Sequence, residues 1–245
     1  MKILVVNDDG YQAEGLKILI EVLKDFGELY VIAPKEHHSG KSNAITIQKA
    51  LHTKEIKLPF VKKAYYVKGF PADCARISSA LFSDVKFDLL VSGINEGANV
   101  GSNIMHSGTI GAAVEGLHLN IPAIAVSSPV GNYYNAKNYT KSLIKTILKH
   151  KLESHLYVLN INFPENDTKP QGVYFSHQSV NYQPNTFIKK GNKYLPVYKR
   201  KEDHDTNSDV YGYFNNFITI TPILRVKNDD KVLKELKEKS VNFNI

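Results

Sequence analysis

The chain has 245 residues, which is enough to bury about 70–75% of its unfolded surface in one full core. Its composition is 42% hydrophobic and 22% charged, and the single Cys74 excludes an intramolecular disulfide and fits a reducing compartment. No apolar run approaches the roughly 18 residues of a membrane helix, and no signal-peptide run precedes the first strand. We therefore expect a cytoplasmic protein without a membrane partner. The net charge of +7 suits an anionic ligand, but the lysine clusters lack the aromatic and arginine pattern of nucleic-acid binders, so no nucleic-acid partner is expected.

Short apolar strands alternate with amphipathic helices along the first 162 residues. This alternation predicts βαβ units and an α/β fold, with a mostly parallel sheet flanked by helices on both faces. Strands are predicted at Lys2–Val6, Leu29–Ala33, Ala64–Val67, Asp88–Val91, Pro122–Val126 and Leu156–Ile161, with a weaker one at Ala44–Ile47. Helices are predicted at Glu14–Phe26, Pro71–Phe82, Thr109–Leu119 and Tyr139–His150.

The pattern changes after residue 162. The segment that follows is rich in Asn, Lys and Tyr, and contains a hairpin turn at Lys190–Asn192. A half-buried strand is predicted at Phe217–Pro222 and a terminal amphipathic helix at Asp230–Lys239. We expect one domain over residues 1–245, with a core of 1–162 and an extension of 163–245. Such a hairpin extension is more often an arm for oligomerisation than a catalytic domain.

Two adjacent carboxylates, Asp8 and Asp9, follow the first strand and precede Gly10. Neighbouring side chains in a strand point to opposite faces, but beyond the strand end both can aim at one point. Two carboxylates about 4 Å apart repel by roughly 4 kcal/mol at an effective dielectric of 20, and a divalent cation would offset this. The alternative is an ordinary turn and helix cap formed by Asn7 and Asp8.

Polar residues also follow other predicted strands. Ser39 comes closely after the second strand, and Asn95 after the strand that ends at Val91. Ligands of parallel sheets bind beyond the carboxyl ends of the strands, so we expect Asp8, Asp9, Ser39 and Asn95 to share one edge. The Ser39–Ser42 segment is not a P-loop, because Lys35 stands where its leading glycine is needed.

Two further segments could bind phosphate. The glycine-spaced loop Gly93–Gly101 carries Asn95 and Asn99, and its glycines allow backbone amides to approach an anion. Ser107-Gly108-Thr109 opens a helix whose free N–H groups form an anion site. The alternatives are a plain glycine-rich turn for the first segment and a helix cap for the second.

Together these motifs resemble the SurE family, the survival-protein-E nucleotidases. The resemblance covers nearly the whole chain in the family's order. The motifs that carry it are Asn7–Gly10, Ser39–Asn43, Gly69–Cys74, Ser92–Gly101, Ser107–Thr109, Glu115–Gly116, Leu159–Pro164 and Ile220–Pro222.

The resemblance implies a metal-dependent phosphatase acting on nucleoside monophosphates at the 5′ or 3′ position. It also implies a Rossmann-like core and a C-terminal arm that is exchanged between subunits in a homodimer or homotetramer. The family's metal ligands fall on Asp8, Asp9, Ser39 and Asn95, and this oxygen set suits one Mg²⁺ or Mn²⁺ per subunit. The chain departs from the family pattern at Phe70, Ser102-Asn103, His106 and Asn216.

The sequence predicts catalytic roles for Asp8, Asp9 and Asn95. The expected phosphate ligands are Asn95, Asn99, Ser107, Gly108 and Thr109. Either a water molecule or Asp8 could be the nucleophile, and His106 is a candidate proton donor by its location. Two rival interpretations use the same cleft: a phosphoaspartyl switch and a non-catalytic protein that binds nucleotides and metal.

Overall fold

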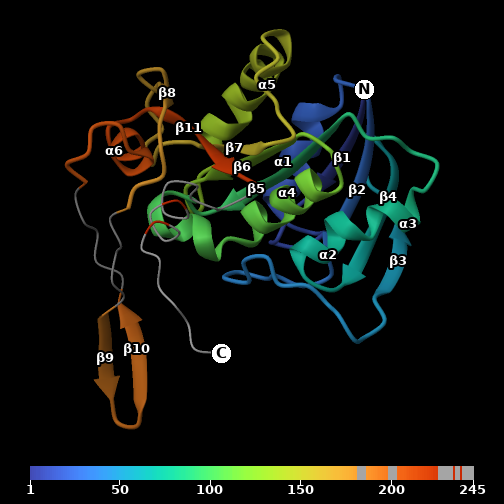
Figure 1. The fold of residues 1–245 in the computed structure, drawn as a ribbon, viewed down its shortest axis with the longest axis horizontal. Helices are drawn as coiled ribbons and strands as arrows, with labels where there is room; N and C mark the ends of the chain where they lie inside the picture. Colours follow the sequence, from blue (N-terminus) through green and yellow to red (C-terminus); the bar gives the residue numbers. More distant parts are fainter. Residues whose placement is uncertain (181–185, 198–202, 226–233, 235–237, 239–245) are drawn as a thin grey trace.

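A computed structural model gives the fold (Figure 1). It describes residues 1–180, 186–197, 203–225, 234 and 238. Within these residues one nine-stranded sheet and a separate two-stranded hairpin are found. The strands are β1 (Lys2–Val6), β2 (Glu28–Pro34), β3 (His52–Ile56), β4 (Val61–Lys68), β5 (Leu89–Glu96), β6 (Ala123–Ser128), β7 (Tyr157–Asn162), β8 (Val173–Phe175), β9 (Thr186–Lys190), β10 (Lys193–Val197) and β11 (Ile218–Leu224).

The helices lie between the strands along the chain. None of those in the described ranges is both long and apolar enough to cross a membrane. They are α1 (Glu14–Leu23), α2 (Pro71–Arg76), α3 (Ser78–Leu81), the 3₁₀ helix η1 (Gly101–His106), α4 (Gly108–His118), α5 (Tyr134–Lys149) and α6 (Asp209–Phe214).

The large sheet has the strand order β3-β4-β2-β1-β5-β6-β7-β11-β8. The central pairs β4–β2, β2–β1, β1–β5, β5–β6 and β6–β7 are all parallel, which confirms the predicted fold class. From β1 the chain adds β2 and β4 on one side of the sheet. It then returns to the other side of β1, where it adds β5, β6 and β7. The order therefore reverses between β1 and β5, and the crevice at the carboxyl ends of these two strands is where such sheets bind ligands.

The central strands are buried on both faces. In β1, Ile3 and Val5 pack into one apolar cluster, and Leu4 and Val6 into another. The first cluster includes side chains of α1 and α5, whereas the second includes side chains of α2 and α4. Figure 1 shows these two pairs of helices on opposite sides of the sheet. This double burial explains why the strands read as continuous apolar runs.

The predicted strand at Ala44–Ile47 is wrong. That segment has no regular structure, and the strand of this region lies at β3. Both the backbone N–H and the hydroxyl of Thr46 donate to the Asp73 carboxylate, at 2.9 and 2.7 Å. The Asp73 carboxylate satisfies the backbone N–H of Thr46, so this N–H does not need a carbonyl acceptor on a neighbouring strand.

The single helix predicted at Pro71–Phe82 is divided into α2 and α3. The hydroxyl of Ser78 donates to the carbonyl of Ala75 at 2.6 Å, and the hydroxyl of Ser79 donates to that of Arg76 at 3.0 Å. Serine hydroxyls that bond to nearby carbonyls compete with the helical ladder and favour a break.

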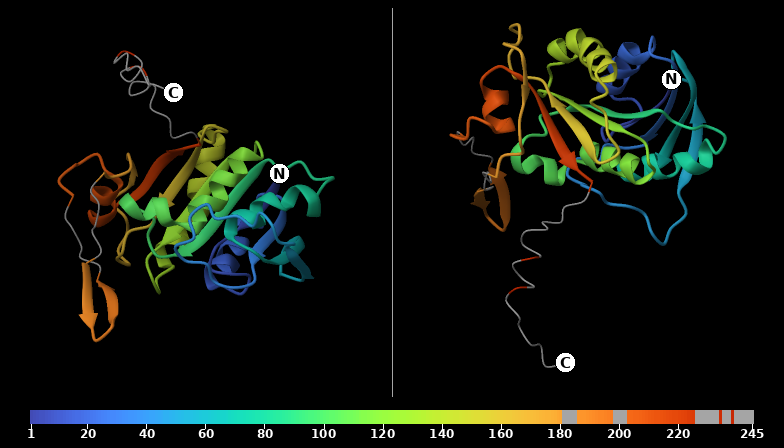
Figure 2. Two further views of the ribbon diagram at one scale, coloured as in Figure 1. Left: turned by 60° about the horizontal axis from the view of Figure 1, so that its bottom comes forward. Right: turned by 45° about the horizontal axis from the view of Figure 1, so that its top comes forward.

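The C-terminal extension contains the predicted hairpin, with β9 and β10 joined at Gly191. This hairpin extends away from the rest of the chain (Figures 1 and 2). The predicted strand near residue 220 is β11, which pairs antiparallel with β7 and so belongs to the main sheet. The helix predicted at Asp230–Lys239 lies outside the described residues, apart from positions 234 and 238.

Candidate functional site

The chain turns sharply where β1 ends. The side-chain amide of Asn7 donates a hydrogen bond to the backbone carbonyl of Gly10 at 2.9 Å. Gly10 has a φ of 101°, a conformation that residues with a side chain rarely adopt. The turn lies at the β1–β5 crevice, where the strand order reverses. The turn holds Asp8 and Asp9 beyond the end of β1, as predicted from the sequence.

Asp8 is a buried carboxylate with 4% exposure. Its Oδ1 atom accepts a hydrogen bond from the hydroxyl of Thr109. Burial raises the pKa of Asp8 to about 6, and the neighbouring charge of Asp9 adds to this, whereas the Thr109 hydrogen bond opposes it. Burial away from water and the like charge of Asp9 both disfavour the ionised form of Asp8. A cation beside Asp8 would therefore stabilise the ionised carboxylate.

Asp9 is held on both of its oxygen atoms. Its Oδ1 lies 3.1 Å from His37 Nδ1, and its Oδ2 accepts the backbone N–H of Glu96 at 3.1 Å. Burial raises the pKa of Asp9, while the Glu96 N–H and the charge of His37 lower it. Asp9 therefore connects the end of β1 to β5 and to the segment that follows β2.

A cleft with a volume of about 200 Å³ opens next to these carboxylates. Five of the eight predicted metal, catalytic and phosphate residues line it, and so does the candidate proton donor His106, whereas Asp9, Gly108 and Thr109 do not. Asn95 lies within β5, which extends to Glu96 and so beyond the predicted strand end at Val91. The other four residues follow β1, β2 and β5 or precede α4. The five residues are Asp8, Ser39, Asn95, Asn99 and Ser107.

The four predicted metal ligands offer oxygen atoms to a cation. Asn95 Nδ2 donates to the carbonyl of Gly97 at 2.6 Å, which leaves the Asn95 side-chain oxygen for a ligand. Within the described residues no Lys or Arg pairs with Asp8 or Asp9, and no group of three or more His, Cys, Asp or Glu could hold a metal. Two carboxylates with neutral oxygen donors suit a hard cation such as Mg²⁺ or Mn²⁺ better than zinc.

His37 links two of the predicted ligands. Its Nε2 atom lies 2.6 Å from Ser39 Oγ, and its Nδ1 atom lies 3.1 Å from Asp9. The sequence placed His37 near this edge but gave it no role, because a single histidine is usually structural or exposed. Its position two residues before Ser39 is the signal that could have identified it as the group orienting Ser39.

Asn99 is positioned mainly by the sheet. Its backbone N–H donates to Asn162 Oδ1 at 2.7 Å, and its carbonyl accepts from the amides of Asn160 and Asn162 at 2.8 and 3.1 Å. Its own side-chain amide donates to Ser127 Oγ at 2.9 Å. The phosphate role predicted for Asn99 stays a prediction, and the geometry shows a buried residue that fixes the loop. Asn160 and Asn162 lie within the sequence motif Leu159–Pro164, but no role was predicted for them, although two asparagines on one face of a buried strand were a visible signal.

Helix α4 begins at the cleft. Ser107 is its N-cap, and its hydroxyl accepts the Ile110 N–H at 3.2 Å, so the helix-cap interpretation of this motif is correct. The free N–H groups of the first turn still make this end favourable for an anion. A Cβ atom added at Gly108 would lie 2.9 Å from the Cβ of Asp8, so glycine permits the close approach of α4 to the acidic turn.

Comparison with known proteins identifies the family of the chain. The family described as Survival protein SurE matches residues 3–185, well over half of the chain. The chain belongs to the SurE family. A relative from Clostridium botulinum (strain Loch Maree / Type A3), described as 5'-nucleotidase SurE, is 32% identical, and the match covers 97% of this chain and 98% of the relative. A protein of the same description from Pseudothermotoga lettingae is 34% identical, and that match covers 97% of this chain and 94% of the relative.

The solved structure of a SurE protein from Aquifex aeolicus is similar over 98% of this chain and 100% of that one, with a TM-score of 0.85 and 28% identity. The resemblance inferred from the motifs is therefore confirmed, and so is the α/β fold expected of a SurE protein. The four departures from the family pattern include His106 and Ser102-Asn103, which line cavities at or beside the cleft.

The Thr109 hydroxyl is expected to orient Asp8 for cation binding. Thr109→Val keeps the shape of this fully buried side chain but removes its donor to Asp8. We expect the apparent affinity for Mn²⁺ to fall about tenfold, because groups that orient metal ligands have effects of this size. Titration of activity against Mn²⁺ measures this change. Thr109→Ser restores the donor and should restore the affinity, and equal affinity in the Val variant would contradict the assignment.

Asp209 ties the C-terminal extension to this site. It is fully buried, and its carboxylate accepts the backbone N–H groups of Gly101, Ser179 and Val210 at 2.9, 2.9 and 2.8 Å. Burial raises the pKa of Asp209, and these three N–H groups oppose the shift. Gly101 begins η1, which leads directly to Ser107, so Asp209 holds the segment between the glycine-rich loop and α4.

Asp209→Asn is expected to lower stability by about 1–3 kcal/mol, because its new NH₂ group faces backbone donors and leaves one of them unsatisfied. The kcat for a phosphate monoester should fall as well, since the loop before α4 loses an anchor. Chemical denaturation and steady-state assays measure the two effects. Asp84→Asn removes an exposed carboxylate and serves as the charge-matched control. If the two variants behaved alike, Asp209 would have no anchoring role.

Proposed function

We propose that this chain is a metal-dependent phosphomonoesterase that hydrolyses nucleoside 5′-monophosphates, and also 3′-monophosphates, to nucleoside and phosphate. The observation that carries the proposal is the pair Asp8 and Asp9 in the β1–β5 crevice, where Asp8 is buried, Asp9 is half-buried, and neither pairs with a Lys or Arg among the described residues. Relatives that share about a third of the sequence are described as 5'-nucleotidase SurE. The acidic pair beside a helix N-terminus gives this activity a physical basis.

One group of residues would bind the cation, and another would bind the phosphoryl group. Asp8, Asp9, Ser39 and Asn95 would hold one Mg²⁺ or Mn²⁺, which supplies charge neutralisation at the phosphoryl group and a lowered pKa for water. The N–H groups at the start of α4, including those of Gly108 and Thr109, would bind the other phosphoryl oxygens.

Two further experiments identify the nucleophile and the proton donor of the reaction. Asp8 could attack phosphorus directly, which a trapped phosphoaspartate and retained configuration at a chirally labelled phosphorus would show, whereas inverted configuration would favour a single attack by water. His106 lines the cleft and is the candidate donor to the leaving alcohol. An acidic pH limb that is unchanged in His106→Gln would remove it from that role.

The test of the proposal is a phosphate-release assay over mononucleotides and a small phosphate monoester, with Mg²⁺, Mn²⁺ or a chelator. We expect AMP and GMP to be hydrolysed only with a divalent cation. Asp9→Asn should lose this activity and serves as the active-site control. Absence of turnover with every substrate and cation would leave a nucleotide-binding protein in place of an enzyme.

The role of the C-terminal arm is also a proposal. We infer that the hairpin β9–β10 joins subunits into a homodimer or homotetramer, because large apolar side chains on it are exposed. Sedimentation at micromolar concentration tests this, and a monomer would contradict it. The exposed side chains on the hairpin are Phe187, Ile188, Tyr194 and Leu195.

The division into a 1–162 core and a 163–245 extension stays a prediction, as does the cytoplasmic location.

A further inference from the structure

The cleft beside Asp8 is too small for a whole nucleotide. Its volume is about 200 Å³, whereas sites for small organic ligands usually occupy about 300–1,000 Å³. A phosphate and a cation fit such a space, but a nucleoside needs an adjoining cavity. Two larger cavities lie nearby and are candidates for that part of a substrate.

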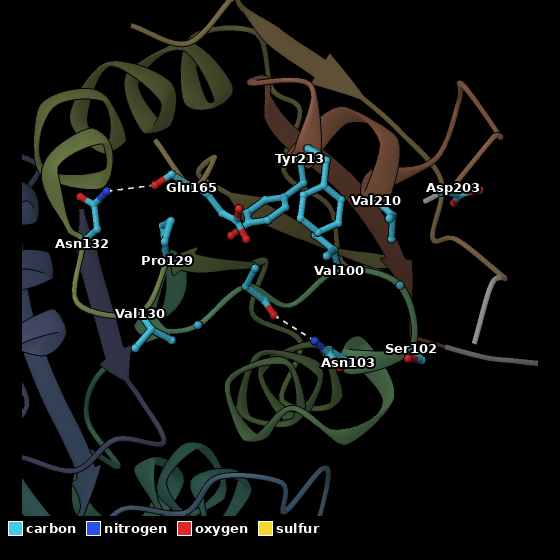
Figure 3. A pocket seen from close by; sticks show the side chains of 14 residues that line it. Val100, Ser102, Asn103, Pro129, Val130, Asn132, Glu165, Asp203, Val210 and Tyr213 are labelled. Atoms are coloured by element: carbon cyan, nitrogen blue, oxygen red, sulfur yellow. Dashed lines mark hydrogen bonds between the residues drawn. The ribbon is translucent and has the colours of Figure 1, made fainter. Parts of the chain in front are cut away.

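The first, here called the aromatic cavity, has a volume of about 520 Å³ and lies between η1, α6 and the loop after β6 (Figure 3). It shares Gly97, Ala98 and Asn103 with the cleft, so the two spaces adjoin. The second, here called the basic cavity, has a volume of about 860 Å³ and lies between the ends of β2 and β4 and the segment 45–50. Among the described residues it shares no lining residue with the cleft.

The walls of the aromatic cavity suit a flat apolar ring. Tyr213 packs with Val100 and Val210 in a small buried cluster, and Phe214 lies edge-on to Tyr213 with ring centroids 5.1 Å apart. Val130 lines the same cavity and is 76% exposed, so it lies at the opening. Figure 3 shows Val130 and Pro129 across the cavity from Tyr213. Aromatic rings favour stacked or edge-on packing against other rings, which a nucleobase can provide.

The charges of the two cavities differ. Glu165 and Asp203 line the aromatic cavity, and none of its described lining residues is Lys, Arg or His. Lys35, Lys49 and Lys68 line the basic cavity. A nucleoside carries no charge at neutral pH, so it fits a cavity without cations, whereas the basic cavity favours an anion.

We propose that the aromatic cavity binds the nucleoside of a nucleoside monophosphate whose phosphate lies in the cleft at Asp8. The ribose then passes the shared residues Gly97, Ala98 and Asn103, and the base lies between the Val130 side and the rings of Tyr213 and Phe214. This assignment depends on the proposed function for the phosphate, but the affinity of the cavity for a free nucleoside does not.

Two exposed apolar residues allow a matched test. Val130→Asp places a carboxylate at the opening of the aromatic cavity, and Ile47→Asp does the same at the basic cavity, where Ile47 is 82% exposed. Because both side chains are exposed, neither change removes core packing. We measure kcat/KM for AMP and for glycerol 2-phosphate, which lacks a base, and the dissociation constant of adenosine by calorimetry.

For Val130→Asp we expect the preference for AMP over glycerol 2-phosphate to fall about tenfold and adenosine to bind about tenfold more weakly. Ile47→Asp should retain the preference and the affinity of the unmodified protein. The reverse pattern, or no change in either variant, overturns the assignment. If the unmodified protein hydrolyses neither ester but binds adenosine in a Val130-dependent way, the proposed function fails and the nucleoside cavity stands.

Discussion

Asp8→Asn is expected to abolish hydrolysis and, at the same time, to make the cation-free protein more stable at neutral pH. The loss of activity should be about 1,000-fold or more, because the carboxylate that lies on the cleft wall and would hold the cation is neutralised. The gain in stability has a separate cause, which is the buried charge of Asp8 itself.

The sign of the stability change follows from proton binding. The folded protein holds the pKa of Asp8 at about 6, against 3.8 as the ordinary value, so the folded state binds the proton more tightly than the unfolded chain does. The contribution of Asp8 to stability is therefore favourable below about pH 4, falls as the pH rises to about 6, and stays low above that. Two pKa units correspond to about 3 kcal/mol, which sets the scale of the gain in Asp8→Asn.

Denaturant titrations with a chelator at pH 4.5 and pH 7.5 measure this effect. The variant should exceed the unmodified protein in stability at pH 7.5 and show little advantage at pH 4.5. Saturating Mn²⁺ should then stabilise the unmodified protein by about 2.7 kcal/mol at 100 times its dissociation constant, but not the variant. A variant that is less stable at pH 7.5 without cation would show that the Asp8 charge is already compensated.

Gly108→Ala is expected to lower kcat/KM about 100-fold while the protein remains folded. The added Cβ would lie 2.9 Å from the Cβ of Asp8, 2.9 Å from the Cγ of Pro71 and 3.0 Å from Asp8 Oδ2. These atoms belong to a buried turn and a proline ring, so Asp8 must shift or α4 must move away. A displacement of about 1 Å at a reacting group can cost on the order of 100-fold in rate.

Gly116→Ala is the matched control for this prediction, because it lies on the same helix. Its added Cβ would lie 2.8 Å from Leu90 Cδ1, the end of a flexible side chain in the core. Overpacking there costs about 1–3 kcal/mol of stability, with little effect on activity. Thermal unfolding and initial rates for both variants separate the two effects. Equal activity in the two variants would show that Gly108 does not position Asp8.

The sequence predicted those features that depend on local pattern. The apolar run of β1, the periodicity of α1 and the turn at Gly191 each contain their own signal, and all three elements are present. The edge shared by Asp8, Ser39 and Asn95 also followed from pattern, because parallel strands place their carboxyl ends together.

Features that depend on contacts far apart in the chain were not predicted. Thr46 pairs with Asp73 instead of with a strand, and Asp209 reaches Gly101 across more than 100 residues. No periodicity records such partners. The clamp of Asn160 and Asn162 on the carbonyl of Asn99 belongs to the same class.

The anchoring of Gly101 by Asp209 has a consequence for how SurE proteins of this kind can be rebuilt. Residues 203–225 supply both the β11 strand beside β7 and the carboxylate that holds η1, so a truncation at residue 162 would remove part of the active-site support. The described part of the hairpin, residues 186–197, pairs only within itself in the sheets that are described. Grafts that replace the hairpin should therefore leave the main sheet intact, whereas residues 203–225 should be kept together with the catalytic core.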